Sequence, residues 1–302
     1  MNEKKKSGAT KAFVLTGIVL LILGLVLCIG GMTALNWDFG KLSTLHYETR
    51  SYSCKIEASS VCVNVENSDI RISLSDTAEQ IEISYPAIFG RDDQQKNKIE
   101  ISADENTGAL TLNESSDYHW TDYLFVIQPK SPEVAIILPA SFTGSLSLNT
   151  EGGDITVRGG SFYSLELNSD YGEITLYDTQ TSKNTLLRTD TGDIELNGVQ
   201  VAEKLTVTVN GAGDIEADNV LAAQLSLYTE YGDIDIGRIN SPSINLKTDY
   251  GDIEGSIIGA ETDYKITASA KVGSCNLDDK SDGNKLLTAH TECGDIKIKF
   301  IA

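Results

Sequence analysis

The sequence is short of basic residues and of proline, and each shortage excludes something. Its 302 residues contain 24 Lys and Arg against 44 Asp and Glu, a formal charge of −20. This balance argues against nucleic acid as a partner, because phosphate binding needs a basic surface. Only 5 Pro accompany 26 Gly, and abundant Thr, Ile, Leu and Val favour strands joined by tight turns. The hydrophobic share of 40 % argues against a disordered chain.

One long uncharged run lies near the N-terminus, over residues 12–35. A helix of that length spans roughly 36 Å, more than the hydrocarbon core of a bilayer at about 30 Å. Four Lys lie within residues 1–11 with Glu3, which leaves 20 basic and 43 acidic residues for the rest. Because positive residues stay cytoplasmic, we predict a single-pass membrane protein with a cytoplasmic N-terminus and an acidic extracytoplasmic part.

A cleaved signal peptide is the alternative interpretation of this run. Its apolar core would usually have about 7–15 residues before a small-x-small site. The run is longer, and Gly31-Met32-Thr33-Ala34 is a poor cleavage signal. A lipoprotein signal at Cys28 fits less well, since Leu27 stands where a small residue is expected. We therefore favour an uncleaved anchor.

The strongest pattern is a recurring Gly-Asp-Ile. It begins at Gly153, Gly192, Gly213, Gly232, Gly251 and Gly294, with degenerate copies at Gly172 (Gly-Glu-Ile) and Gly273 (Gly-Ser-Cys). Successive glycines lie 19 to 22 residues apart, and a Thr or Ser usually lies three residues before the glycine. Eight copies at a near-constant spacing indicate a repeat architecture.

Alternating apolar residues around each glycine predict two short strands joined by a turn. If each unit forms one coil, equivalent apolar positions stack about 4.8 Å apart and build a continuous core. Glycine would allow a close approach that a side chain obstructs. We predict an all-β fold for residues 144–302: a β-solenoid, single-stranded and of the right-handed parallel β-helix type, with coils of about 20 residues. An antiparallel meander is the alternative, but it would alternate two kinds of turn.

Residues 50–143 are less regular but also rich in alternating apolar residues. Asn67-Ser68-Asp69-Ile70 resembles an eroded copy of the repeat turn. We predict irregular first coils or an N-terminal cap of the same solenoid, with a separate small β-domain as the alternative. The organisation is then a basic tail (1–11), a transmembrane helix (12–35), a linker (36–49), the irregular part (50–143) and the regular repeats (144–302).

These features resemble a bacterial family of unknown function whose members are described as putative adhesins. The resemblance covers roughly residues 50–302. It rests on the anchor, on the repeated Thr-x-x-Gly-Asp-Ile, and on Val134-Ala135-Ile136-Ile137-Leu138-Pro139 leading into Ser145-Leu146-Ser147-Leu148-Asn149-Thr150. It implies β-strand repeats and, for some relatives, a place beside envelope-stress or membrane-signalling systems. It implies no catalytic residues.

The repeat places carboxylates at two fixed positions. One follows each glycine, at Asp154, Glu173, Asp193, Asp214, Asp233, Asp252 and Asp295; the other lies two residues before it, at Glu151, Asp170, Asp190, Glu230, Asp249 and Glu292. Stacked coils would align them in two columns, where like charges repel and cations collect. Oxygen ligands suit Ca²⁺, so the six aspartates after the glycines are candidate metal ligands. The unit lacks the known calcium-loop signatures, so we favour solvated turns that cap backbone groups. Docking of a basic partner is a third interpretation.

A polar segment holds the candidate partner-binding residues Tyr118, His119, Trp120 and Tyr123, in a chain with only 2 Trp. Aromatic side chains over a polar rim stack on a sugar or anchor a protein partner. The more common outcome is that such a cluster packs on its own scaffold.

Two further residue types recur next to the repeat glycines. Tyr171, Tyr231 and Tyr250 each precede a glycine and are expected to form an aromatic stack. Cys293 occupies the same position, whereas Cys275 occupies the Ile position after the glycine. Four cysteines outside the membrane permit disulfides, but these two fall in different columns, so we expect no bridge between them.

An enzyme is the alternative from another class, because β-helices include polysaccharide lyases and hydrolases. Such sites need convergent carboxylates with basic or His partners in a groove. His46, His119 and His290 lie far apart in the sequence, and the carboxylates recur uniformly. We therefore predict a protein without enzymatic activity.

The C-terminal residues Ile296, Ile298 and Phe300 continue a strand pattern to the end of the sequence. Unpaired backbone at a solenoid end invites another chain, so we expect this end to bind a partner or, by end-to-end self-association, a second copy, with Lys297 and Lys299 as charged gatekeepers. The sequence predicts a membrane-anchored scaffold that binds a glycan, a matrix or a surface protein. An accessory subunit of an envelope-sensing system, which contacts a neighbouring membrane protein, is the alternative.

Overall fold

The computed structural model describes residues 8–34, 36–37, 43–55, 58–118 and 131–301. Residue contacts divide the chain into two units. The first contains the α-helix α1 (Gly8–Ala34), and the second contains Tyr47–Ile88, Gln95–Asp117 and Ser131–Ala302. Most of the second unit is β-structure. The prediction of a mostly β chain with an N-terminal apolar helix is therefore confirmed.

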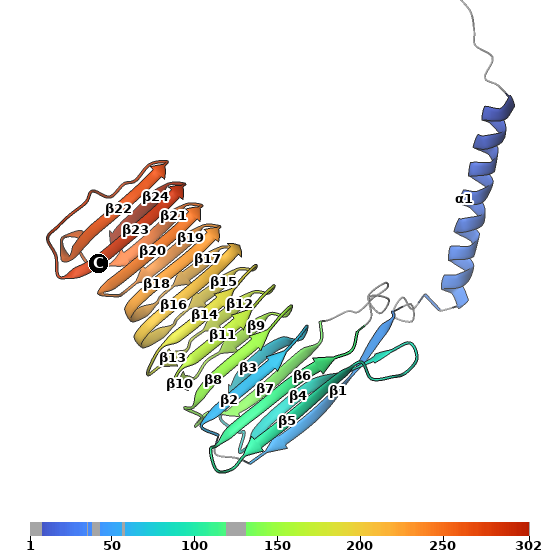
Figure 1. Ribbon diagram of the computed structural model, residues 1–302, viewed down its shortest axis with the longest axis horizontal. Helices are drawn as coiled ribbons and strands as arrows, with labels where there is room; N and C mark the ends of the chain where they lie inside the picture. Colours follow the sequence, from blue (N-terminus) through green and yellow to red (C-terminus); the bar gives the residue numbers. More distant parts are fainter. Residues whose placement is uncertain (1–7, 35, 38–42, 56–57, 119–130, 302) are drawn as a thin grey trace, which may run out of the picture. The chain divides into compact units, whose positions relative to one another are not determined.

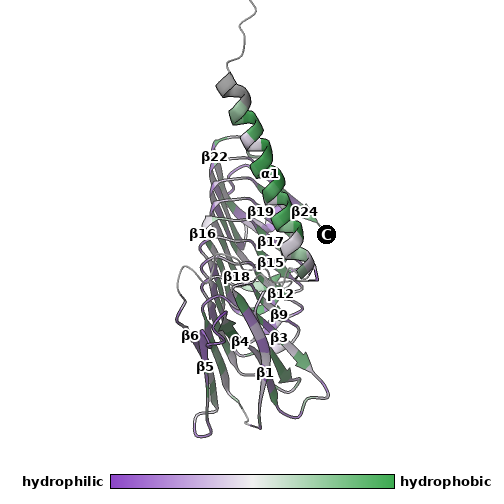
Figure 2. Ribbon diagram, turned by 90° about the vertical axis from the view of Figure 1, so that its right-hand side faces the viewer, coloured by the Kyte–Doolittle hydropathy of each residue, from purple (hydrophilic) through white to green (hydrophobic). Residues whose placement is uncertain are grey.

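The helix α1 covers the apolar run identified in the sequence. Its residues Ala12–Ala34 are long and apolar enough to cross a membrane, and they are not buried by the rest of the chain. Figure 2 shows the hydrophobic colour along most of this helix, in contrast to the mixed colours of the strands. A signal sequence meets the same criteria of length and composition.

The strands form two sheets, in which Figure 1 shows one strand stacked beside the next. The 11-stranded sheet has the order β1 (Leu45–Cys54), β4 (Ile81–Gly90), β7 (Glu133–Pro139), β3 (Asp69–Ser75), β9 (Ile155–Arg158), β12 (Ile174–Tyr177), β15 (Ile194–Asn197), β17 (Ile215–Asp218), β19 (Ile234–Ile239), β21 (Ile253–Ile258) and β24 (Ile296–Ile301).

The 13-stranded sheet has the order β22 (Tyr264–Val272), β23 (Lys285–Cys293), β20 (Ser243–Tyr250), β18 (Leu221–Tyr231), β16 (Gln200–Ala212), β14 (Thr185–Thr189), β11 (Leu165–Ser169), β8 (Ser145–Thr150), β2 (Ser60–Val65), β6 (Ala109–Ser116) and β5 (Asn97–Asp104). Its two short strands lie beside this path, where β13 (Gln180–Thr181) pairs with β10 (Ser161–Phe162) and with β16. A short 3-10 helix, Glu261–Asp263, precedes β22.

Neighbouring strands of the repeats run parallel and in register. In the 11-stranded sheet Ile174 pairs with Ile155 on one side and with Ile194 on the other. The same column of buried isoleucines, none more than 1 % exposed, comprises Ile70, Ile155, Ile174, Ile194, Ile215, Ile234, Ile253 and Ile296. Parallel strands about 4.8 Å apart bury such a column continuously, so each coil is stabilised mainly by its two neighbours.

The less regular N-terminal strands continue the same sheets. β2 pairs in parallel with β8, and β3 pairs in parallel with β9. The eroded turn predicted at residues 67–70 is a coil turn, because Asp69 Oδ1 accepts the Asp154 N–H at 3.0 Å and Ile70 pairs with Ile155. Beyond this coil, β4 pairs antiparallel with β7 and β5 pairs antiparallel with β6. These antiparallel strands end the parallel stacking.

The order of the last coils differs from their order in the sequence. If the coils followed the sequence, the turns of Gly251, Gly273 and Gly294 would stack in that order. Instead, β24 pairs directly with β21, and β23 lies between β20 and β22. Cys275 then pairs with Ile296 from the outer side. The coil of Gly294 is therefore inserted before the coil of Gly273, and β22 is the edge of the 13-stranded sheet.

Side-chain chemistry explains this inversion. The Thr291 hydroxyl donates to Gly251 O at 2.9 Å, whereas Ala270, its register partner on β22, has no hydroxyl. Asp295 Oδ1 accepts the Ser274 N–H at 2.8 Å, but Ser274 has no carboxylate to offer a further coil. The coil of Gly273 donates the Ser274 amide to the coil of Gly294 but has no carboxylate to accept the amide of a further coil. It is therefore suited to the last position.

The outer edges of the last coil are partly covered by the segment that connects β22 to β23. Ile266 on β22 exchanges backbone hydrogen bonds with Lys280 at 3.0 Å. On β24, the Asn276 side chain accepts from Ile298 N at 3.0 Å and donates to Ile298 O at 2.9 Å. In the part of the chain that the structure describes, no strand pairs with the rest of the outer edge of β22.

Candidate functional site

The repeat turns form one edge of the stack, which we call the turn edge: the residues from three before each repeat glycine to one after it. Here successive coils approach too closely for a side chain. An ideal Cβ on Gly172 would lie 2.0 Å from Gly153 O, and one on Gly232 would lie 2.1 Å from Gly213 O. The carbonyl of the preceding coil limits every repeat glycine in this way, at 1.9–2.4 Å. The glycines are therefore required for coil contact.

The hydroxyl three residues before the glycine also binds the neighbouring coil. Thr189 Oγ1 donates to Gly172 O at 3.1 Å, and Thr229 Oγ1 donates to Gly213 O at 2.8 Å. Ser169, Thr248 and Thr291 make the same bond to Gly153, Gly232 and Gly251. Two coils are exceptions: Val209 is the register partner of Thr189 in the coil of Gly213, and Ala270 is the register partner of Thr291 in the coil of Gly273.

Valine substitutions at two threonines of one coil are expected to change the free energy of unfolding in opposite directions. Thr189 is fully buried and uses its hydroxyl, so Thr189→Val should cost about 1–2 kcal/mol by leaving a carbonyl without that donor. Thr179 is equally buried, but its hydroxyl has no hydrogen-bond partner among the described residues, so Thr179→Val should stabilise the fold by about 1 kcal/mol. Urea unfolding of the solubilised chain measures both changes, and a loss for Thr179→Val would contradict this reading.

The aspartates after the glycines form a ladder of side chain to backbone bonds. Asp214 Oδ1 accepts the Asp233 N–H at 2.8 Å, and Asp233 Oδ1 accepts the Asp252 N–H at 2.7 Å. The same bond joins Asp154 to Glu173, Asp193 to Asp214, Asp252 to Asp295 and Asp295 to Ser274. Each carboxylate thus caps an amide of the next coil.

This geometry matches the capping role that we favoured from the sequence. Within the described ranges, no group of three or more His, Cys, Asp or Glu side chains is placed to hold a metal ion. Calcium binding by Asp154, Asp193, Asp214, Asp233, Asp252 and Asp295 stays a prediction.

The second carboxylate column, two residues before the glycines, is partly neutralised. Lys247 Nζ lies 2.9 Å from Asp249 Oδ1, and the Tyr228 hydroxyl donates to Asp249 Oδ2 at 2.9 Å. Burial, and then this hydrogen bond, raises the pKa of Tyr228 to about 12. Lys271 Nζ lies 2.6 Å from Glu292 Oε1. The column is therefore a mixture of paired and unpaired carboxylates.

The residues directly before the glycines form an exposed apolar strip at one end of the turn edge. The rings of Tyr231 and Tyr250 stack with centroids 5.1 Å apart and planes within 5°. Tyr250 is the register partner of Cys293, which is the partner of Val272. We call Tyr231, Tyr250, Cys293 and Val272 the apolar strip. Both tyrosines are about half exposed and Val272 is 66 % exposed, so no described residue covers the strip.

The predicted stack of three tyrosines is only partly correct. Tyr171 belongs to the same column but is separated from Tyr231 by the coils of Gly192 and Gly213. Among the described residues, only Tyr231 and Tyr250 of this column form a ring contact. Cys275 and Cys293 are both free, as are Cys54 and Cys62, which agrees with the expectation that the first two do not form a bridge.

The predicted aromatic segment lies largely outside the described residues. His119, Trp120 and Tyr123 fall in the range 119–130, and only Tyr118 of the four lies in the described part, where it is half-buried. Their proposed contact with a partner stays a prediction.

Residues 58–301 match the model of a family described as Toastrack DUF4097. The chain belongs to the Toastrack DUF4097 family. Two solved structures are similar to it. One, a crystal structure of a putative adhesin from Bacteroides fragilis, shares 18 % identity over 84 % of this chain and 97 % of that chain, with a TM-score of 0.45. The other, a putative cell adhesion protein from Clostridium sporogenes, shares 10 % identity over 84 % and 100 %, with a TM-score of 0.28. The comparison with curated proteins gave no match.

An acidic hollow of about 310 Å³ lies on the 11-stranded sheet of the Toastrack region. It is lined by small residues, Ala217, Gly237 and Gly255, and by carboxylates, Glu195, Glu216, Asp218, Asp235 and Glu254. This group of carboxylates was not among the predicted site residues. Four of the carboxylates occupy one repeat position, three residues after the glycine, and pair in register on adjacent strands. Aligning that position across the repeats would have shown it.

Asp235 in this hollow is expected to destabilise the fold at neutral pH. Burial, and then repulsion by Asp233 and Glu254, raises the pKa of the Asp235 carboxyl. A carboxyl whose folded pKa is raised opposes folding above that pKa, and the penalty disappears as the pH falls through it. Asp235→Asn should therefore stabilise the protein at pH 7 by less than about 1 kcal/mol, because solvent screens the group, and should lose its advantage in acid.

Thermal unfolding between pH 3 and 7 tests this expectation. Asp104→Asn is the matched control: hydrogen bonds from Asn106 N–H and the Thr107 hydroxyl lower the pKa of Asp104, so the same change there should destabilise. A gain for Asp235→Asn that persisted at the lowest pH would contradict the explanation.

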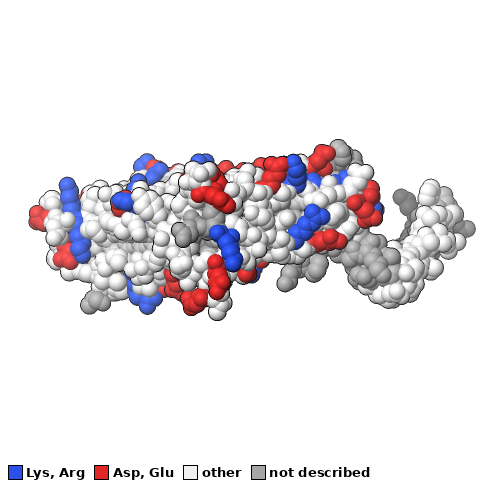
Figure 3. Space-filling view, turned by 90° about the horizontal axis from the view of Figure 1, so that it is seen from below, with Lys and Arg blue, Asp and Glu red and all other residues white. Residues whose placement is uncertain are grey.

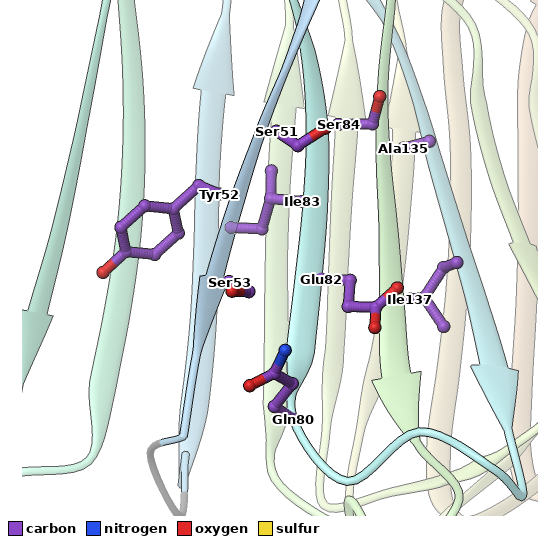
Figure 4. Close-up of a pocket in the computed structure, with 9 residues that line it drawn as sticks. All are labelled: Ser51, Tyr52, Ser53, Gln80, Glu82, Ile83, Ser84, Ala135 and Ile137. Carbon is purple, nitrogen blue, oxygen red and sulfur yellow. The ribbon is translucent and has the colours of Figure 1, made fainter.

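A second hollow, of about 320 Å³, lies among β1, β4 and β7 (Figure 4). Small side chains at Ser51, Ser53, Ser84 and Ala135 leave this space, and the Tyr52 ring points away from it. Glu82 is its single titratable carboxyl. A lone carboxyl among hydroxyl groups does not provide the acid and base pair that glycoside cleavage requires.

His290 contacts two other polar side chains. His290 Nδ1 lies 2.7 Å from Ser269 Oγ, and Nε2 lies 3.1 Å from Glu292 Oε1. The three side chains are held on β22 and β23, but neither hollow includes them, and Glu292 is also paired with Lys271. They form part of a surface network of charges.

Charge is mixed on part of the surface. Figure 3 shows Lys and Arg side chains among Asp and Glu, with uncharged surface between them. The face in this view thus carries no field of a single sign, whereas the turn edge and the acidic hollow hold carboxylates in columns.

Proposed function

We propose that this Toastrack protein is a membrane-anchored extracytoplasmic binding module that acts as an adhesin or surface scaffold and not as an enzyme. One observation carries the proposal: the polar groups of the repeat motif bind neighbouring coils. The Thr229 hydroxyl, the Gly213 carbonyl and the Asp214 carboxylate are all engaged between coils. The motif therefore builds a rigid support, and binding falls to the surfaces that this support presents.

The proposal includes a topology. Helix α1 is the anchor, residues 1–11 are cytoplasmic, and residues 36–302 lie outside; the lysines before the helix support this orientation. We also infer that the strands wind as a right-handed parallel β-helix with one coil per about 20 residues. Parallel pairing in register and the right-handed preference of crossovers between parallel strands support this winding.

A second candidate function is an accessory subunit of an envelope-stress or membrane-signalling system. It is favoured by the surface of α1, where a Cβ added to Gly24, Gly30 or Gly31 would meet nothing within 4 Å. Small residues of this kind let a neighbouring membrane helix approach closely. The two functions differ in partner, because an adhesin contacts an external glycan or protein and a subunit contacts a membrane protein.

Crosslinking in intact cells tests both functions. The full chain is compared with a version in which α1 is replaced by an unrelated membrane helix. We expect an external protein or wall glycan to be recovered equally with both anchors. Recovery of a membrane protein only with the native α1 would overturn adhesion in favour of the subunit function. Cleavage of a polysaccharide by the purified chain would contradict the non-enzymatic proposal.

A further inference from the structure

We propose that the apolar strip docks an extended, basic segment of a partner protein. The proposal rests on the binding function proposed above and gives it a site and a class of partner. The strip consists of Tyr231, Tyr250, Cys293 and Val272, which are register partners on the adjacent strands β18, β20, β23 and β22.

The strip is long enough to contact a short extended segment. Four strands at about 4.8 Å spacing extend over roughly 14 Å, which matches about four residues of extended chain. The stacked rings of Tyr231 and Tyr250 and the exposed side chain of Val272 provide apolar contact along this length. The inverted order of the last coils decides how the strip is arranged, since β23 places Cys293 beside Tyr250 and β22 places Val272 beside Cys293, at the open end.

The end of the strip is open. Val272 is the last residue of the edge strand β22, whose outer side is paired only in its first half: Ile266 pairs with Lys280, and Ala268 N–H donates to Asp279 Oδ1 at 2.9 Å. From Ser269 to Val272, no strand of the described chain lies on that side. A partner segment can therefore continue past the last coil without displacing any part of the protein.

Charge determines which kind of segment fits. Seven carboxylates flank the strip, from Glu230, Asp249 and Glu292 on one side and Asp214, Asp233, Asp252 and Asp295 on the other. Three lysines pair with them: Lys247 with Asp249, Lys271 with Glu292, and Lys297 with Asp295. The surroundings keep a negative excess, and Glu230 has no ion-pair partner among the described residues.

Apolar side chains with Lys or Arg among them complement this surface. The apolar groups would cover the tyrosines, the basic groups would reach the carboxylates on both sides, and guanidinium groups also stack on tyrosine rings. A second copy of this chain fits less well, because it would bring the same carboxylates against each other. The complementarity therefore favours a basic partner over self-association at this surface.

Peptide binding to the full chain in lipid nanodiscs tests the proposal. The probe is a fluorescein-labelled nonapeptide of alternating Arg and Val, and the comparison probe has Glu in place of Arg. Fluorescence anisotropy should show binding of the Arg peptide and none of the Glu peptide. Tyr231→Ser/Tyr250→Ser should weaken the Arg peptide by about tenfold or more, since buried aromatic anchors dominate such contacts.

Matched variants distinguish peptide binding at the apolar strip from nonspecific electrostatic attraction to an acidic protein. Tyr171→Ser removes an exposed tyrosine from the same column, outside the strip, and should leave the affinity unchanged. Glu230→Gln beside the strip should weaken binding severalfold, whereas Glu216→Gln in the acidic hollow should not. Circular dichroism and unchanged melting temperatures establish that the variants are folded.

Three outcomes would overturn the inference: unchanged affinity in the double tyrosine variant, no binding of the Arg peptide, or equal binding of the Glu peptide. Cell crosslinking distinguishes this failure from failure of the proposed function. An external partner recovered equally with the double tyrosine variant would refute the strip and leave the binding function intact. Recovery of no external partner, even with the unmodified chain, would refute the function itself.

Discussion

Gly232→Ala is expected to destabilise the protein by about 3–5 kcal/mol, through overpacking that the backbone cannot relieve. The new Cβ would lie 2.1 Å from Gly213 O and 2.7 Å from its carbonyl carbon. Both contacts are with backbone, so no side-chain rotation removes them. Moving the two coils apart would stretch the bonds from Thr229 Oγ1 to Gly213 O and from Asp233 N to Asp214 Oδ1, both 2.8 Å.

Urea unfolding of the solubilised full chain measures this loss, and Gly159→Ala is the matched control. Gly159 has a left-handed φ of +72° but open space around its Cβ position, whereas Gly232 has no left-handed φ. Gly159→Ala should therefore cost only the conformational penalty, about 1–2 kcal/mol. If the control lost as much stability as Gly232→Ala, close approach between coils would not be the reason for the repeat glycines.

The arrangement within a coil could be predicted because every part of the motif has a local chemical reason. A glycine indicates where two coils approach closely. The Thr hydroxyl and the Asp carboxylate indicate a hydrogen-bond donor and an acceptor that need partners, and alternating apolar residues indicate the buried face of a strand. Even the eroded turn at Ser68-Asp69-Ile70 follows this logic. Asp69 is retained because the Asp154 N–H needs an acceptor.

The order of the coils could not be read from spacing alone, because a repeat contains the same contact surfaces in every copy. The copies that depart from the Gly-Asp-Ile motif indicate which coils lie at the ends of the repeat. The first coil with the turn motif supplies an acceptor to the next coil through Asp69 and has Ser68 in the glycine position; on its other side it pairs in parallel with β6 and β7. The last coil needs room but no acceptor, and it has Gly273 with Ser274 in the aspartate position. Ser274 therefore marks a coil after which none follows.

Surface features were predicted less well, since they depend on which coils become neighbours. Tyr171 and Tyr231 share a position in the repeat but lie three coils apart, so they do not stack. The inverted order decides that Cys293, and not Val272, lies beside Tyr250. The acidic hollow requires four register neighbours and the small residues Gly237 and Gly255 beside them, a combination that no single repeat displays.

The inverted order predicts very different losses of stability for aspartate substitutions at two equivalent repeat positions. Ile296 is fully buried, with Ile253 on one side and Cys275 on the other. Ile296→Asp places a charge between two coils with no basic partner in its column, and should cost about 4–5 kcal/mol. Hydrogen exchange should also show loss of protection in β22, because β23 is the only long strand of the described chain that pairs with it.

Cys275→Asp is the control that makes this a test of order. Cys275 occupies the same repeat position as Ile296 but is only half-buried, and no coil covers its outer side in the described chain. A carboxylate there can turn toward water, so the expected loss is about 1 kcal/mol or less. If the coils were stacked in sequence order, Cys275 would lie between Ile253 and Ile296, and Ile296 would be terminal. The two losses would then be reversed, so their ranking by urea unfolding decides between the two arrangements.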